Sequence, residues 1–382
     1  MRIAPAVLAL AVLGATPAAR AQVYLRGQDQ PLKGQVAGVS AAGIAIIREG
    51  DQGKAVVGWD RVREVRGEHG REAQAFHSLS DQVWRARTRL ERGDIGAAEP
   101  LLEAVLAEHP DLDGPTGAVV WESLLRCRLR RGAMAGAVQP WLARQRVWME
   151  SCGRAAGACV GGRSELGAIV DDRTGLAPML PPIWLPDAAL LPASEGWIAA
   201  AGSDAAVKDL AMLYRAAARY ELGLNAELSQ PLTGGEGVRL VHDVVLARVG
   251  DDSERGAARE ALVGRLTSKE LPAWQEAWCR AAIGRSLLRE QDESLRRRGV
   301  VQLLHVPARF ARATPGLAGV CLAEAAAALK AMNDPGGAAA VKAELVDRMP
   351  QHPALGWAPV RDLSAPAEPK DGKARLPGKE GG

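Results

Sequence analysis

The chain has 382 residues, with 48 Lys and Arg against 45 Asp and Glu, so its formal net charge is only +3. This balance argues against a general nucleic-acid surface, which needs a clustered basic excess. The length predicts two or more folding units.

Residues 1–21 have the features of a secretory signal peptide. Arg2 precedes an apolar run over residues 3–13, and an A-x-A cleavage site ends at Ala21. The alternative, a membrane anchor, needs about 18 or more apolar residues, and this run is shorter. We therefore expect an exported, soluble chain that begins at Gln22, in the periplasm or outside the cell, with no membrane span. Without the two arginines of the signal, the mature chain has 46 basic and 45 acidic residues.

Residues 22–68 predict a small β unit. Short β-prone runs over residues 23–25, 34–39, 44–47 and 55–59 are separated by glycines at the spacing of hairpins. The pattern resembles SH3-like or Sm-like small β barrels. We expect Trp59 to be a core residue rather than a ligand platform. A unit of this size is marginally stable alone, so it should pack on the helical part.

Residues 81–110 predict a helical hairpin. Gly93 ends a first helix, since glycine tolerates the left-handed backbone of a helix end, and Asp94 can cap the next one. Apolar residues then recur at three- and four-residue spacing around Leu102, which makes one stripe along the second helix. Pro110 ends this helix. Neither helix can bury its stripe alone, so each needs a neighbour.

A second copy of this pattern covers residues 121–143. Three positions match at a spacing of 39 residues: Gly93 and Gly132, Ala98 and Ala137, and Leu102 and Trp141. The chain here resembles the tetratricopeptide repeat family, whose period is about 34 residues. That family's small residues, first-helix anchors and closing proline match Ala86, Ala98, Trp121, Leu124 and Pro110. Leu125 and Arg128 depart from the motif, and the Gly/Pro-bearing connection over residues 110–116 accounts for the longer spacing. The resemblance implies a solenoid of antiparallel helix pairs.

Helical patterns continue to residue 355, so we assign residues 72–355 to one repeat domain. It is interrupted by a Gly/Pro-rich insertion over residues 152–193. An irregular segment this long is unusual in a compact domain; it either plugs the solenoid or forms a lid over a groove. Its apolar residues should dock onto helices. The tail over residues 364–382 has almost no apolar content and is expected to be disordered.

The sequence contains no recognisable catalytic, metal or cofactor motif. The five cysteines form no C-x-x-C and the six histidines no H-x-x-x-H pair. Cys152 and Cys159 either form a disulfide or remain small core residues, whereas Cys127, Cys279 and Cys321 lie in helical patterns and should be buried. Serine-elbow, dinucleotide and phosphate-loop patterns are incomplete or missing. We therefore predict no metal, cofactor or catalytic residue.

Arginines cluster on the second repeat and supply the candidate binding residues. In tetratricopeptide proteins the first helix of each pair lines the inner groove. By this register Arg126 and Arg130 face the groove one turn apart, and Arg87 is the matching position one repeat earlier. Arginine forks hold carboxylates bidentately, so these residues could grip an acidic peptide or a chain terminus. The alternative is a solvated, salt-bridged helix face.

The sequence therefore predicts a mostly α, tetratricopeptide-like solenoid with a small N-terminal β barrel-like unit. Its expected role is that of a non-catalytic protein-interaction scaffold in a bacterial cell envelope, with a protein or peptide partner. Two alternatives stay open: an envelope hydrolase or glycan-acting enzyme with its site beneath residues 152–193, and a purely structural oligomer. The sequence does not predict the oligomeric state.

Overall fold

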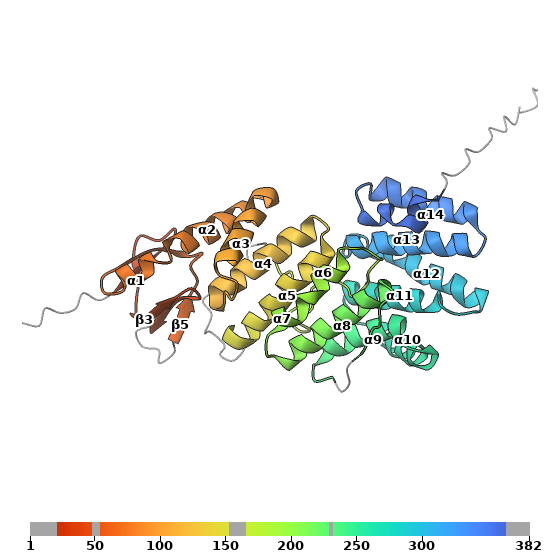
Figure 1. Ribbon diagram of the computed structural model, residues 1–382, viewed down its shortest axis with the longest axis horizontal. Coiled ribbons are helices and arrows are strands. Elements are labelled where there is room, and N and C mark those ends of the chain that lie inside the picture. Colours follow the sequence, from red (N-terminus) through yellow and green to blue (C-terminus); the bar gives the residue numbers. More distant parts are fainter. Residues whose placement is uncertain (1–20, 48–53, 153–165, 229–231, 364–382) are drawn as a thin grey trace, which may run out of the picture.

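The computed structural model describes residues 21–47, 54–152, 166–228 and 232–363. In this part the protein is mostly helical, with all strands between residues 22 and 66 (Figure 1). No helix in the described ranges is long and apolar enough to cross a bilayer. The predicted signal lies outside these ranges except for Ala21, and the predicted disordered tail over residues 364–382 lies wholly outside them.

The strands form two antiparallel sheets that do not close into a barrel. One sheet has the order β2-β1-β6 and the other the order β3-β4-β5. The strands are β1 (Gln22–Leu25), β2 (Pro31–Leu32), β3 (Gln35–Ser40), β4 (Gly43–Ile47), β5 (Lys54–Val57) and β6 (Val62–Arg66). The outer strands β6 and β5 contact helices α1 (Gly70–Gln74) and α4 (Gly114–Arg130). Helices therefore cover edges that strand pairing would have to join in a barrel.

The chain passes from one sheet to the other at Gly34, between β2 and β3. Its φ of 149° lies in the region that favours glycine. A Cβ at this position would lie 2.6 Å from Cγ2 of Ile46 and 2.7 Å from the carbonyl oxygen of Ile47. Only glycine allows β2 and β3 to belong to different sheets with so short a connection.

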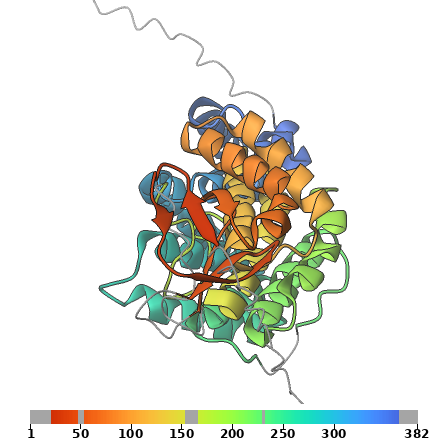
Figure 2. The same cartoon turned by 90° about the vertical axis from the view of Figure 1, so that its left-hand side faces the viewer.

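The β unit packs against the first helices through one shared core (Figure 2). Trp59 is buried, donates from Nε1 to the Ser40 carbonyl at 2.7 Å and stacks on Phe76 at 5.3 Å. The Ser80 hydroxyl, on α2, lies 3.0 Å and 2.8 Å from the carbonyl oxygens of Trp59 and Val62. Trp59 is thus the core residue that the sequence predicts. The unit lies at the N-terminal end of the helical body (Figure 1).

The helical body is built from packed helix pairs that follow one another from α2 to α14 (Figure 1). Its longer helices are α2 (His77–Glu91), α3 (Ile95–Glu108), α4, α5 (Met134–Val147), α8 (Ala205–Glu221), α9 (Glu236–Val249), α10 (Asp252–Leu266), α11 (Ala273–Leu287), α12 (Glu293–Phe310), α13 (Pro315–Ala331) and α14 (Pro335–Arg348). Shorter elements are the π-helical turn η1 (Trp148–Cys152), α6 (Leu190–Glu195), α7 (Trp197–Ala201), η2 (Pro353–Gly356) and α15 (Ala358–Arg361).

The same turn ends four of these helices. After α2, α4, α8 and α13, a residue with positive φ precedes an amide that donates to the carbonyl five residues back. These bonds all measure 2.9 Å and join Asp94 to Arg89, Ala133 to Arg128, Leu224 to Arg219, and Asp334 to Leu329. The predicted cap at Asp94 is present, because its side chain accepts from the amide of Ala97. The predicted stripe is also present, with Leu102 fully buried.

The described part of the insertion, residues 166–193, runs among the helices as mostly irregular chain. Its apolar side chains are buried as predicted, notably Leu176, Leu180, Ile183 and Trp184. They belong to the same core as α5, α8, α9 and α11. This part of the insertion is therefore an internal component of the helical body.

A buried ion cluster joins four helices of the body to this insertion. Arg285 on α11 donates from Nε to both carboxylate oxygens of Glu324 at 2.8 Å, and from Nη2 to the carbonyl of Trp184 at 2.9 Å and to Glu221 at 3.0 Å. Glu221 also accepts from Arg248 at 2.9 Å. Burial opposes ionisation of Glu221, but both arginines outweigh it and hold the pKa of this carboxyl below its usual range.

Candidate functional site

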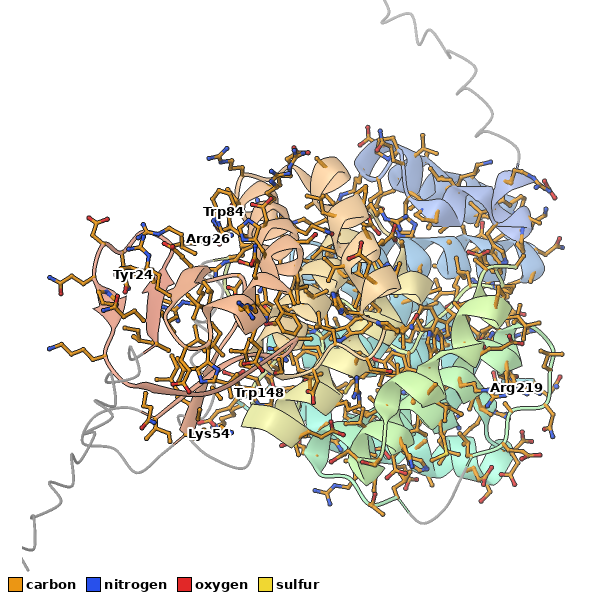
Figure 3. All side chains as sticks on the ribbon, turned by 60° about the vertical axis from the view of Figure 1, so that its left-hand side comes forward. Tyr24, Arg26, Lys54, Trp84, Trp148 and Arg219 are labelled. Atoms are coloured by element: carbon orange, nitrogen blue, oxygen red, sulfur yellow. The ribbon has the colours of Figure 1, made fainter. Side chains whose placement is uncertain are left out.

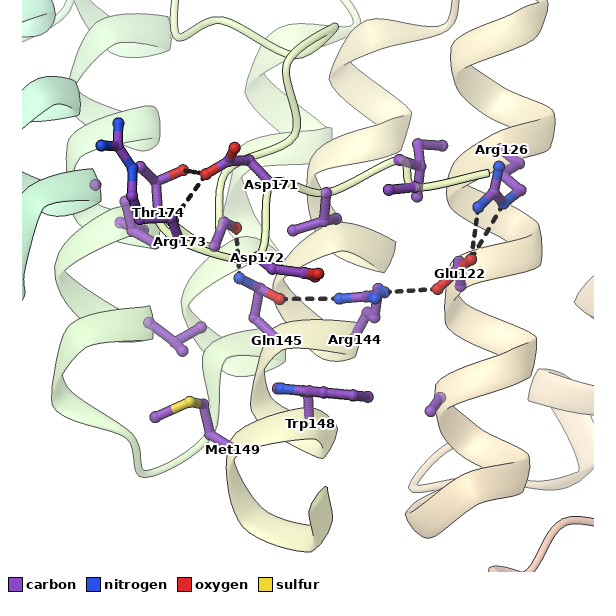
Figure 4. Close-up of a pocket in the computed structure, with 18 of the residues that line it drawn as sticks. Glu122, Arg126, Arg144, Gln145, Trp148, Met149, Asp171, Asp172, Arg173 and Thr174 are labelled. Carbon is purple, nitrogen blue, oxygen red and sulfur yellow. Dashed lines mark hydrogen bonds and ion pairs between the residues drawn. The ribbon is translucent and has the colours of Figure 1, made fainter. Parts of the chain in front are cut away.

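A cleft of about 890 Å³ lies between two walls of the helical body (Figure 4). Helices α2, α4 and α5 form one wall. Residues 166–175, with the first residues of α8 and α9, form the other. Much of the lining is aliphatic and includes Leu90, Val119, Leu166, Ile169, Val207 and Val238. A concave, mostly apolar surface with a few polar groups is the usual form of a binding site.

Glu122 is the centre of a charged network on the α4 and α5 wall. Its carboxylate accepts from Arg126 at 2.7 Å, one turn along the same helix, and from Nε of Arg144 at 3.0 Å. Arg144 continues the chain of bonds to Gln145 at 3.2 Å (Figure 4). Burial disfavours the charged form of Glu122, but Arg144 and Arg126 together hold its pKa below its usual range. Glu122 is therefore ionised at neutral pH and carries one negative charge between two positive ones.

Arg126 also joins the two walls. Its Nη1 donates to the Leu166 carbonyl at 3.3 Å and its Nη2 donates to the Gly167 carbonyl. With Nε directed to Glu122, every nitrogen of this guanidinium has a partner, and the residue is 6% exposed. Arg126 thus positions the start of the described insertion.

The structure brings two of the three candidate arginines to the cleft. Arg87 and Arg126 line it, and Arg130 does not. Arg130 is the last residue of α4 and is exposed beyond the end of the cleft lining. Arg87 pairs with Asp60 and with Glu91, each at 2.7 Å. Their role in holding a partner stays a prediction.

Two large apolar side chains that line the cleft, Trp148 and Met149, are exposed to solvent, with exposed fractions of 47% and 46%. Both belong to η1, a π-helical turn that directly follows α5, and such turns are frequent at functional sites. The Cζ atom of Arg144 lies 5.7 Å from the centre of the Trp148 ring. The sequence analysis did not single out these residues, although a Trp-Met pair at a helix end, directly before a Gly-rich stretch, is a usable signal.

Several carboxylates of the opposite wall have structural partners. Asp171 accepts from the amide and hydroxyl of Thr174 at 2.9 Å and 2.7 Å. Asp204 caps α8 by accepting from the Val207 amide at 3.0 Å. Glu236 lies 3.4 Å from Arg173. These groups fix the shape of the wall.

From the edge of the cleft onward, helix side chains hold the insertion by its carbonyl groups. The donors are Trp141 and Gln145 to Gly175, Trp278 to Pro178, Tyr214 to Leu180, and Arg285 to Trp184. They come from α5, α8 and α11, so three helices grip this one irregular stretch.

Three cysteines are buried free thiols, as the helical pattern predicts: Cys127, Cys279 and Cys321. Burial raises the pKa of Cys127 to about 11 and that of Cys279 to about 12. The possible Cys152–Cys159 disulfide concerns side chains outside the described ranges. Among the described residues, no group of three or more His, Cys, Asp and Glu is placed to hold a metal ion.

Outside the cleft, one aromatic contact marks the junction of the β unit and α2. Figure 3 shows Arg26 beside Trp84, and the guanidinium lies 4.4 Å from the ring centre. Arg26 also donates to Ser80 at 3.1 Å. This contact fastens the two parts together at the surface.

Comparison of the chain with protein-family models, with curated proteins and with solved structures returned no match. The candidate site therefore rests on the residues and geometry of this chain.

Proposed function

We propose that this protein is an exported, non-catalytic interaction scaffold of a bacterial cell envelope, which holds a segment of a partner protein in the cleft. The observation that carries this proposal is the aliphatic lining beside half-exposed Trp148 and Met149. The volume of about 890 Å³ falls within the range of about 300–1,000 Å³ typical of ligand sites. Aromatic residues, Met and Arg are also enriched at protein interfaces.

The proposed framework is a tetratricopeptide-like solenoid. The recurring turn after α2, α4, α8 and α13 supports it, because it gives successive hairpins the same local geometry. The motif residues quoted above, Ala86, Ala98 and Pro110 among them, support it independently. Export to the periplasm or beyond is proposed from the A-x-A site that ends at Ala21.

Affinity capture from envelope extract tests the proposal when the bait is varied at the cleft. The mature chain is compared with a Trp148→Ala, Met149→Ala double variant, which removes two exposed side chains and should leave the fold intact. Val301→Ala is the matched control, since Val301 is 55% exposed on α12, away from the cleft. We expect a protein that the native chain and the control enrich and the double variant loses. Equal enrichment by all three baits would show that the cleft does not hold the partner.

The enzyme alternative is the second candidate, because the insertion does line this cleft, with Asp171 and Asp172 among its residues. We rank it second because Asp171, Asp204 and Glu236 already have structural partners. The test is whether the protein releases soluble fragments from purified envelope glycan. Release by the native chain that is lost in Asp172→Asn would favour the enzyme over the scaffold.

A further inference from the structure

Within the proposed function, on which this inference rests, we infer that the partner segment bound by the cleft is apolar and rich in proline. The protein already holds one such segment. Residues 176–186, with four prolines, lie against the same helical body next to the cleft. The way in which this segment is held shows which chemistry the surface accepts.

The hydrogen bonds from helix side chains to residues 175–184 are all donated to carbonyl oxygens. An indole Nε1–H of Trp141 reaches Gly175 at 3.1 Å, and that of Trp278 reaches Pro178 at 3.1 Å. The Tyr214 hydroxyl reaches Leu180. A wall of donors suits a proline-rich chain, since proline offers a carbonyl acceptor but no amide donor.

One amide of the segment is bonded within the segment itself. The amide of Leu180 donates to the Ala177 carbonyl at 2.8 Å, which closes a turn with Pro178 in its second position. Pro181 and Pro182 have no amide hydrogen to satisfy. Each proline removes an amide donor from the segment and keeps a carbonyl acceptor, and donor side chains such as Trp and Tyr complement these carbonyls.

The cleft borders this donor surface and has donor groups of its own. Gly175 both accepts from the helix side chains and lines the cleft, so the two regions share a border. Beyond it, Arg87 and Arg144 each use Nε and Nη1 in bonds, while Nη2 bonds to no described residue. Trp148 adds an exposed ring beside Arg144. Aromatic surfaces with donor groups are the common means of binding proline-rich peptides.

The charged groups that line the cleft favour a neutral partner segment over an acidic one. The cleft lining contains four arginines and five carboxylates, so it carries no positive excess to attract a negative segment. Two of these arginines, Arg126 and Arg144, already share Glu122. A neutral apolar segment that accepts hydrogen bonds through its carbonyls fits this balance better than the acidic peptide suggested by the sequence.

Fluorescence anisotropy with three labelled peptides tests the inference on the full mature chain. The first peptide has the sequence of residues 174–187 of this protein, the second has its four prolines replaced by alanine, and the third is acidic and proline-free. Each is titrated with the native chain, Trp148→Ala and the control Val301→Ala. Circular dichroism verifies that the variants are folded.

We expect the proline-rich peptide to bind at least about tenfold more tightly than its alanine version, and Trp148→Ala to weaken it by about tenfold or more. Val301→Ala should not change binding. Equal affinity for the first two peptides, no binding of the first, or preference for the acidic peptide would each overturn the inference. Those results would leave the proposed function standing if capture from envelope extract still depends on Trp148 and Met149.

Discussion

Substitution of Arg285 tests whether the buried ion cluster holds the helical body and the insertion together. Arg285 is 3% exposed and binds Glu324, Glu221 and the carbonyl of Trp184. Arg285→Met keeps most of the volume but removes the charge and its donors. Glu221 retains Arg248, whereas Glu324 remains buried with no other ion partner among the described residues.

Breaking a buried pair in this way costs about 3–5 kcal/mol, because one charge is left uncompensated. We expect Arg285→Met to lower the free energy of unfolding in urea by this amount. The double variant Arg285→Met, Glu324→Met should recover part of the loss, since it leaves no orphaned carboxylate. The control Arg297→Met breaks an exposed pair with Glu293 and should change stability by about 0–1 kcal/mol. A loss below about 1 kcal/mol for Arg285→Met, or a double variant less stable than the single one, would refute this reasoning.

Three further predictions concern stability and reactivity. Leu102→Ala should cost about 2–5 kcal/mol in urea unfolding because Leu102 is fully buried, while Val346→Ala at an exposed position should stay within about 0.5 kcal/mol; a Leu102 loss of that small size would contradict the placement of its stripe. Burial lowers the pKa of His352, so the unfolded chain takes up a proton first and stability falls as pH drops below about 6.5. The loss should appear in the segment that directly follows His352. Amide hydrogen exchange of residues 353–363, corrected for intrinsic rates, should be faster at pH 5.5 than at pH 7, and equal corrected rates would contradict this prediction. Because burial raises the pKa of Cys127 to about 11 and of Cys279 to about 12, mass spectrometry after thiol labelling at pH 8 should find both unmodified until urea is added; rapid labelling of the native chain would be contrary evidence.

The parts of the fold that depend on local sequence were predictable. Gly93 predicted the end of one helix and Asp94 the cap of the next, and the structure has both. The division of the β unit into two sheets was not predictable, because strand pairing depends on contacts beyond the local sequence, such as that of β5 with α4, whose first residue lies more than 50 positions further along the chain. The glycine pattern indicated short strands but not their pairing partners.

The candidate site shows the same limit. The register implied by the tetratricopeptide resemblance placed Arg126 and Arg130 in a groove, and Arg126 is buried in the cleft wall. A register gives the face of a helix but not how far the neighbouring elements extend along it, so it did not show that Arg130 lies beyond the cleft. The partners of Arg126 at residues 166 and 167 are 40 and 41 positions away, and no local pattern reports such contacts. Trp148 was missed because its exposure depends on how α5 ends.

Site-specific photo-cross-linking tests the central claim, that the cleft holds a partner segment, most directly. A photoreactive amino acid replaces Met149 in one variant and the control residue Val301 in another, and each exported chain is irradiated in intact cells. The account predicts a discrete adduct from position 149, identified by mass spectrometry as a proline-rich stretch of one envelope protein, and none from position 301. No adduct at position 149, or the same adducts from both positions, would contradict it.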